Sequence, residues 1–279
     1  MIGNSGARME YYGRRLASML SLVLFVAAPV TARGAQQEED FIKPGRPGVA
    51  NHAEIQKPGV LQLEAGYDAN FRAEEFRSQQ ELPLALRFAA NRRLLLALNF
   101  DAVFSEADDA GVRMTGVGDV RLGVQAVALP DSGKRPALAF AYYVKLPSAS
   151  EGKKLGTGRV DHKIVLLLSK KAGQTEVDFN AAYLNVGREG SNGRKSGGQA
   201  ALSVSQELGR DFGLQGELAG QSEDDGQPRG VFALGALTYK VSRRLQLDVG
   251  VRFGLNPSAP RVGVFAGVTV AVADLYKHD

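Results

Sequence analysis

The chain has 279 residues, a formal net charge of +4 at pH 7, no cysteine and no tryptophan. The absence of cysteine excludes a disulfide scaffold and thiolate metal sites. Basic and acidic residues alternate without a basic stripe, which argues against nucleic-acid binding. Glycine is frequent, with 33 residues, which disfavours helix interiors and suits tight turns and close backbone approach.

The N-terminus has the features of an export signal. Arg14 and Arg15 precede the apolar run LASMLSLVLFVAAPV at residues 16–30, which is short for a membrane-spanning helix but suits a signal-peptide core. Small residues allow cleavage after Ala32, and a site three residues later is an alternative. We predict a signal peptide over residues 1–32, whose removal takes away three basic residues and one acidic residue and leaves a formal charge of +2. An uncleaved anchor helix is the other interpretation, but no stop-transfer pattern follows.

The next segment, residues 33–58, is predicted to be an extended periplasmic lead-in. Pro44, Pro47 and Pro58 break any helix there. We also consider that residues 36–58 tuck under or into the barrel lumen as a plug. The pattern then changes to alternating apolar and polar residues and does not change back, so we expect residues 59–279 to form one domain.

The first stretch of that domain, GVLQLEAGYDANF at residues 59–71, has a period of two. Leu61 and Leu63 alternate with Gln62 and Glu64, which is typical of a strand with one apolar and one polar face. Alone, such a face fits either a soluble core or lipid. The expected strands cover residues 60–71, 80–90, 93–104, 115–129, 136–146, 160–170, 175–187, 198–208, 211–220, 230–241, 244–254 and 261–273. These lengths are close to the ~9–11 residues of a tilted transmembrane strand.

The connections between these strands alternate between long and short. PSASEGKKLGTGR and QSEDDGQPRG are long, whereas NR, KAGQ, GR and SR are short. This alternation places long loops at one end of a meander and tight turns at the other, as in bacterial outer-membrane barrels. We therefore predict an all-β fold, a closed up-and-down antiparallel transmembrane β-barrel of about 12 strands, with long extracellular loops and short periplasmic turns.

The two faces of the predicted strands differ in chemistry. One face is rich in leucine and valine and is expected to contact lipid, with interfacial aromatic residues near the strand ends. These are Tyr67, Phe71, Phe88, Phe104, Tyr142, Tyr183, Tyr239 and Phe253. The other face carries more charges than a packed soluble barrel can bury. The predicted lumen-lining residues are Glu64, Asp68, Arg87, Asp101, Asp119, Arg121, Lys145, Asp161, Lys163, Asp178, Glu217, Asp248 and Arg252.

Short motifs give no indication of catalysis. GVGDV at residues 116–120 and GTG at residues 156–158 do not complete a phosphate-binding loop, and no helical pattern follows them. His52, His162 and His278 lack metal-ligand spacing. The lipid-facing parity of His162 fits an outer-membrane phospholipase, but no serine of matching parity stands out on a neighbouring strand. We expect an interfacial histidine, no enzyme activity, no cofactor and no metal.

Two stretches resemble a known family. GVGDVRLGVQA at residues 116–126 and YYVKLPSASEGKKLGTGRVDHKIVLLLS at residues 142–169 are similar to a Gly-Asp strand followed by KLP…GTG..D. The sequence RPGVANHAEIQKPG followed by LQLEAGYD also fits. This pattern resembles bacterial outer-membrane barrels labelled as transporters of the phenol-degradation meta-pathway. The resemblance implies a barrel that passes small, often hydrophobic or aromatic molecules, and it supplies no catalytic residues.

These patterns favour a channel or facilitator of the bacterial outer membrane, through whose charged lumen small solutes, hydrophobic or aromatic ones included, pass passively. The alternative is a structural or adhesive barrel whose lumen is closed by its own salt bridges, and a soluble periplasmic protein is a third interpretation. The expected partners are outer-membrane lipid, lipopolysaccharide, the outer-membrane insertion machinery and a small-molecule solute, without nucleic acid.

Overall fold

The computed structural model describes residues 40–153, 155–188, 190–223 and 229–276. The predicted signal peptide, residues 1–32, lies outside the described residues. The described chain consists of antiparallel strands, connecting segments and one short 3-10 helix, η1 (Glu151–Lys153). No helix in these ranges is long and apolar enough to span a membrane.

The strands follow one another along the chain with few interruptions. Their bounds are β1 (Val60–Phe71), β2 (Ser78–Ala89), β3 (Leu94–Ala107), β4 (Arg113–Gly116), β5 (Val120–Leu129), β6 (Ala137–Leu146), β7 (Asp161–Ala172), β8 (Thr175–Gly187), β9 (Arg194–Leu208), β10 (Phe212–Gln221), β11 (Gly230–Ser242), β12 (Leu245–Gly254) and β13 (Val262–Asp274).

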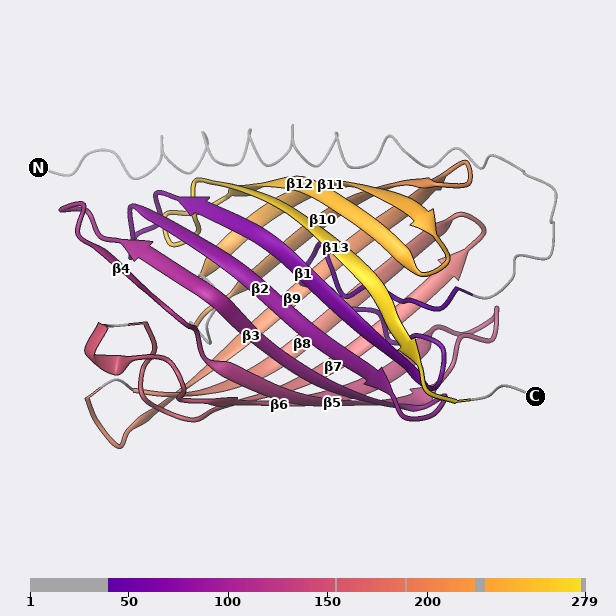
Figure 1. The fold of residues 1–279 in the computed structure, drawn as a ribbon, viewed down its shortest axis with the longest axis horizontal. Helices are drawn as coiled ribbons and strands as arrows, with labels where there is room; N and C mark the ends of the chain where they lie inside the picture. Colours follow the sequence, from indigo (N-terminus) through magenta and orange to yellow (C-terminus); the bar gives the residue numbers. More distant parts are fainter. Residues whose placement is uncertain (1–39, 154, 189, 224–228, 277–279) are drawn as a thin grey trace, which may run out of the picture. The chain divides into compact units, whose positions relative to one another are not determined.

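These strands form one sheet that closes into a barrel (Figure 1). Apart from β4 and β5, successive strands pair antiparallel, and β1 pairs with β13 to close the wall. β4 pairs with β3 near its end, and β5 pairs with residues 94–99 of β3. These two strands therefore share one position in the wall, which gives a twelve-stranded barrel. The predicted closed up-and-down antiparallel barrel is confirmed.

The segment predicted as one strand over residues 115–129 is divided between β4 and β5. At the break, the amide N–H of Gly118 donates to the carbonyl oxygen of Asp101 at 2.9 Å, and the Asp119 carboxylate accepts the amide N–H of Ala149 at 2.8 Å. A side chain at Gly118 would overlap that of Asp101, so only glycine fits there. The alternation of apolar and polar residues in the sequence did not indicate that residues 117–119 leave the hydrogen-bonded strand.

The long and short connections alternate as predicted. The connections at residues 147–160 and 222–229 are long, whereas those at residues 173–174 and 243–244 have two residues each. The long connections lie at the left end of the barrel in Figure 1, and the short turns and the end of β13 lie at the right. Consecutive strands therefore run in opposite directions through the full length of the wall.

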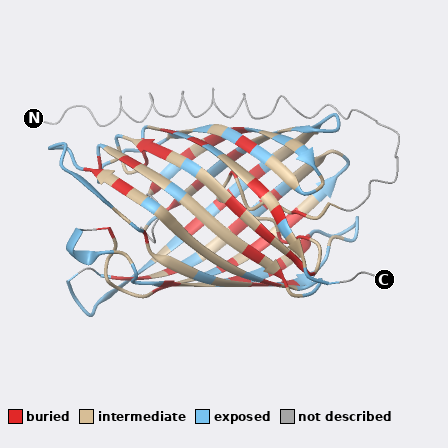
Figure 2. Cartoon of the chain, viewed as in Figure 1, coloured by how far each residue is buried: buried red, intermediate tan, exposed pale blue. Residues whose placement is uncertain are grey.

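Buried and more exposed residues alternate along the strands of the wall (Figure 2), and the residues of the two faces differ in chemistry. Large apolar side chains remain exposed on the outside, such as Ile164, Phe140 and Val249, each more than half exposed. Polar side chains such as Gln62 and Asp178 are buried on the inside. Because side chains alternate between the faces of a strand, the wall combines an apolar exterior with a polar interior.

Phe104 departs from this pattern. A register shift between β2 and β3 places Phe104 opposite Glu81, which in turn lies opposite the inward residue Asp68. Residues directly opposite each other share a face of the sheet, so Phe104 lies on the inward face and not at the outer interface. The cause is a β-bulge, in which one extra residue of β3 reverses the alternation that the sequence pattern assumes.

Candidate functional site

Residues 40–58, here called the lumen segment, lie inside the barrel. The segment begins at the short-turn end, where the amide N–H of Phe41 donates to the carbonyl oxygen of Arg243 at 3.1 Å. It returns to the same end, where the amide N–H of Gly59 donates to Ala89 at 2.7 Å. The described part of the expected lead-in, residues 40–58, thus occupies the barrel interior. None of its described residues joins the strand ladder.

Inward carboxylates of the wall bind the backbone of the lumen segment. Glu64 accepts the amide N–H of Gly45 at 2.9 Å. Glu217 accepts the amide N–H groups of Val49, at 2.9 and 3.0 Å, and of Ala50, at 3.0 Å. A segment rich in proline and glycine cannot satisfy these buried N–H groups through a helix or a ladder, so the wall supplies the acceptors. This physical need explains why the segment lies against the polar face.

Neutral side chains of the wall continue this pattern. Asn180 accepts the amide N–H of Asn51 at 2.7 Å and donates to its carbonyl oxygen at 2.8 Å. The hydroxyl of Ser169 accepts the amide N–H of Ala53 at 2.7 Å. Gln125 donates to the carbonyl oxygen of Ala53 at 3.1 Å. The lumen segment is therefore held by many separate side-chain hydrogen bonds from several strands.

A cavity of about 270 Å³ lies between the lumen segment and the wall. Its lining extends from Gly45 and Val49 of the segment to residues near the long-connection ends of strands, such as Asn70 and Gln221. Eight of the predicted lumen residues line this cavity: Glu64, Asp68, Arg87, Asp101, Asp119, Arg121, Lys163 and Arg252. The structure thus brings together residues that are distant in sequence around one cavity.

Ion pairs organise the charges of this cavity. Arg87 and Glu64 are 3.0 Å apart and both are buried. Arg252 binds Asp68 through two hydrogen bonds of 3.1 and 3.2 Å, and its guanidinium carbon lies 5.1 Å from the centre of the Phe232 ring. Paired charges with additional hydrogen bonds lower the cost of burying ions. The cavity is therefore lined by fixed charges that are mostly compensated by ion pairs.

Lys145 lies between two carboxylates beside this cavity. Its ammonium nitrogen is 3.2 Å from Asp119 and 2.5 Å from Asp161, and all three side chains are buried. Asp161 also accepts the amide N–H of Gly187 at 2.7 Å. Lys145 and Asp161 do not line the cavity, so this cluster connects strands of the wall next to it.

The last three predicted residues bind the lumen segment and do not line the cavity. Asp248 binds Arg46, Glu217 binds backbone N–H groups, and Asp178 lies 3.1 Å from the Nδ1 atom of His52. Thus all thirteen predicted residues lie on the inward side of the wall. Eight line the cavity, two belong to the ion-pair cluster beside it, and three bind the lumen segment.

The sequence pattern missed Arg46, Asn51 and His52, which all belong to the lumen segment. Periodicity assigns faces only to strands, and this segment has no period. The sequence indicated the position of this segment only indirectly, because the inward face carries many carboxylate and amide acceptors that require donors. Such acceptors, next to a segment that cannot satisfy its own N–H groups, favour a position of this segment inside the lumen.

A sequence profile of the family described as "Putative MetA-pathway of phenol degradation" matches residues 45–272, which include part of the lumen segment and nearly all of the barrel. The chain belongs to this family. The matched region therefore includes both the barrel and part of its internal segment. No curated protein sequence matches the sequence of this chain.

Solved structures show the same fold for this family member. An outer-membrane channel from Pseudomonas putida F1 aligns with a TM-score of 0.60 and 15% identity, over 81% of this chain and 98% of that chain. The KdgM porin aligns with a TM-score of 0.52 and 10% identity, over 76% of this chain and 99% of that chain. With its apolar exterior, this MetA-pathway family barrel is a protein of the bacterial outer membrane.

Proposed function

We propose that the protein is an outer-membrane channel for the passive passage of small solutes, and that the lumen segment restricts the path. The observation that carries this proposal is the cavity of about 270 Å³ inside a membrane barrel, bounded by the wall and by the lumen segment. Burial of charges costs desolvation energy, and a polar interior is typical of outer-membrane barrels, including those that form channels.

The path runs from the long-connection end through the cavity and past the lumen segment. The segment is held by individual hydrogen bonds to side chains, each of which contributes about 0.5–1.5 kcal/mol net between neutral groups and about 1.5–3 kcal/mol where one group is charged. Its displacement leaves the strand ladder intact, because its described residues take no part in that ladder. We propose that this displacement opens the channel.

The cavity also suggests the class of solute. Compensated charges, such as the Arg252–Asp68 pair, lie next to the aromatic side chains of Tyr143 and Phe232. A surface of this kind suits small molecules that combine an apolar or aromatic body with a polar group. Such solutes agree with the description of the family.

We further propose that the protein is not an enzyme. His162 lies on the outward face, and its Nδ1 atom is 2.7 Å from the hydroxyl oxygen of Tyr142. In a serine hydrolase an acidic side chain orients the histidine through its Nδ1 atom, whereas here Nδ1 contacts a tyrosine hydroxyl. We also propose that residues 1–32 direct export, that the insertion machinery assembles the barrel, and that lipopolysaccharide contacts its outer rim.

Transport by proteoliposomes tests the proposal. Purified full-length protein is reconstituted, and swelling is measured with small solutes that are neutral, anionic, cationic or aromatic. The channel proposal expects swelling that depends on solute size and exceeds that of protein-free liposomes. The alternative, a structural barrel closed by its ion pairs, expects no swelling with any solute.

A further inference from the structure

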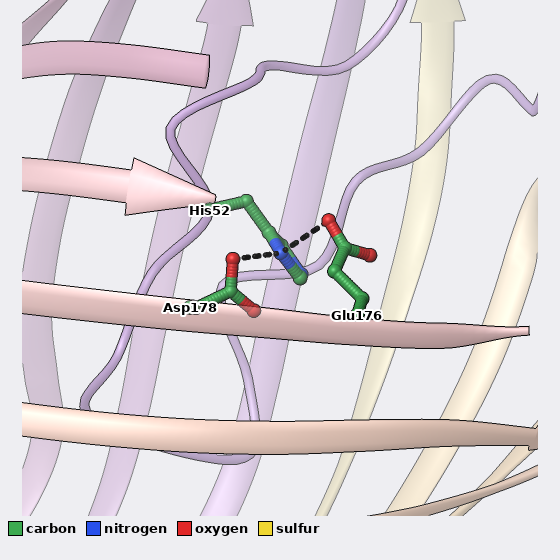
Figure 3. A group of neighbouring side chains, drawn as sticks. All are labelled: His52, Glu176 and Asp178. Carbon is green, nitrogen blue, oxygen red and sulfur yellow. Dashed lines mark hydrogen bonds and ion pairs between the residues drawn. The ribbon is translucent and has the colours of Figure 1, made fainter. Parts of the chain in front are cut away.

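His52, Glu176 and Asp178 form a compact cluster inside the barrel (Figure 3). Glu176 and Asp178 are two residues apart on β8, so both side chains project from its inward face. His52 reaches them from the lumen segment. Its Nδ1 atom is 3.1 Å from Asp178 Oδ1 and 3.3 Å from Glu176 Oε1. The cluster thus joins the segment to the wall through one nitrogen and two oxygen atoms.

We propose that these three residues bind a divalent transition-metal ion of the zinc class. One potential ligand atom from each residue lies within 4.8 Å of the others. Ligands about 2.1 Å from a tetrahedral zinc ion are roughly 3.4 Å apart, so both separations from Nδ1 are already close to the required spacing. Imidazole with two carboxylates is a ligand set for zinc and related divalent metals, and it leaves a fourth position open.

Asp178 provides a second, independent observation. Its side chain is 1% exposed, and its Oδ2 atom is buried without a hydrogen-bond partner among the described residues. A buried carboxylate oxygen without a donor is costly, and a cation that contacts Oδ2 as well as Oδ1 would offset that cost. The other oxygen, Oδ1, accepts a hydrogen bond from the hydroxyl of Ser169 at 2.5 Å. That bond orients the carboxylate, as outer-shell partners do in metal sites.

Lys43 competes with a metal ion at this cluster. Its ammonium nitrogen is 2.7 Å from Glu176 Oε1, the same oxygen that faces His52. Metal binding requires this oxygen to be shared or the ammonium group to move to the other carboxylate oxygen. Removal of the Lys43 charge should therefore increase affinity for the metal, whereas loss of a ligand should decrease it.

The experiment measures Zn²⁺ binding to purified, untagged full-length protein in detergent, by competition with a chromogenic chelator. The wild type should bind one Zn²⁺ per chain, H52A and D178N should each weaken binding by about tenfold or more, and K43M should strengthen it. H162A is the matched control, because His162 lies on the outward face, and its affinity should equal that of the wild type. Heat-modifiable mobility in gels verifies that every variant is folded.

Binding that is not saturable, or an affinity that is unchanged in both H52A and D178N, overturns the proposal. Co²⁺ gives a second readout, since coordination by nitrogen and oxygen produces visible absorption bands that must disappear in H52A. Neither measurement involves transport, so failure of the metal site is distinguishable from failure of the proposed channel function.

Discussion

Arg46 of the lumen segment binds Asp248 of β12 through two hydrogen bonds of 3.2 Å each. The guanidinium lies against Gly66 of β1 and Gly267 of β13, which are paired in the wall, and a methyl group at either glycine would overlap it. The two glycines therefore form a shallow cradle for the guanidinium group. The Arg46–Asp248 pair can form in this position because neither glycine has a side chain. This pair fixes the segment to the wall.

Substitution of Gly267 by alanine should displace the Arg46 guanidinium and release the lumen segment. The overlapping atoms belong to the end of a flexible side chain, so the barrel itself should remain folded. Loss of hydrogen bonds to a charged group should weaken docking by about 1.5–3 kcal/mol. Because the chain has no cysteine, Ala53→Cys, at a fully buried position of the segment, reports release through its rate of modification by a thiol reagent.

The control for this experiment is Gly216→Ala in the same cysteine background. A methyl group at Gly216 of β10 meets no atom within 4 Å, so the substitution changes backbone freedom without a new contact. It should leave the modification rate at the value of the background protein. Equal acceleration by both alanine substitutions would contradict the role of the glycine cradle.

Glu217→Ala should also release the lumen segment. The substitution removes the acceptor of two buried amide N–H groups, those of Val49 and Ala50, at a cost of about 1–3 kcal/mol for each unsatisfied group. Channel open probability in planar bilayers should rise. Glu207→Ala is the control, because Glu207 pairs with Lys171 at a site that is nearly half exposed, where ion pairs contribute about 0–1 kcal/mol. An open probability that is the same in both variants would argue against gating by the segment.

Docking of the lumen segment should depend on pH through His52. Burial and the nearby Lys43 lower the pKa of His52, but Asp178 and Glu176 raise it by more, so the net pKa lies above the ordinary value of 6.5. The ion pairs therefore stabilise docking fully below pH 6.5, and this contribution decreases as the pH rises through the higher pKa of the docked state. Modification of Ala53→Cys should become faster over that range, after correction for the intrinsic reactivity of the thiol.

The substitution His52→Gln tests the origin of this pH dependence. Glutamine retains a side chain that can form hydrogen bonds but does not titrate. The corrected modification rate of the His52→Gln variant should be independent of pH over the same interval. A pH dependence that persists in this variant would assign the effect to another group.

A charge on the outward face should destabilise the barrel in lipid. Val249 of β12 is 52% exposed on the outside, and arginine near the bilayer midplane costs about 2–4 kcal/mol. Val249→Arg should lower the free energy of unfolding, measured by urea titration in lipid vesicles, whereas Val249→Ile should have little effect. Unchanged stability of Val249→Arg would mean that this face does not contact acyl chains.

The sequence predicted the barrel because each strand repeats the same physical constraint. Leu61 and Leu63 alternate with Gln62 and Glu64, and eleven more segments repeat this pattern, so an error at one strand does not change the fold. The exceptions are local. Phe104 is reversed by a bulge, and residues 117–119 leave the ladder at Gly118. Both depend on contacts between strands that periodicity does not encode.

The candidate site was only partly predictable for a different reason. Asp178 and Glu217 were identified as inward residues, because strand parity determines the direction of a side chain. Their partners, His52 and Val49, lie in a segment without secondary structure, whose position follows from three-dimensional complementarity. The pairing of Arg46 with Asp248 depends in addition on the glycine cradle, which no single strand reveals.

Single-channel recording in planar bilayers tests the central claim most directly, namely that the barrel is a channel restricted by its lumen segment. We predict discrete ionic conductance for the wild type, and a higher open probability for the double variant Arg46→Ala, Glu217→Ala, which removes two anchors of the segment. Absence of conductance in both proteins, when each is folded and inserted, would contradict the account.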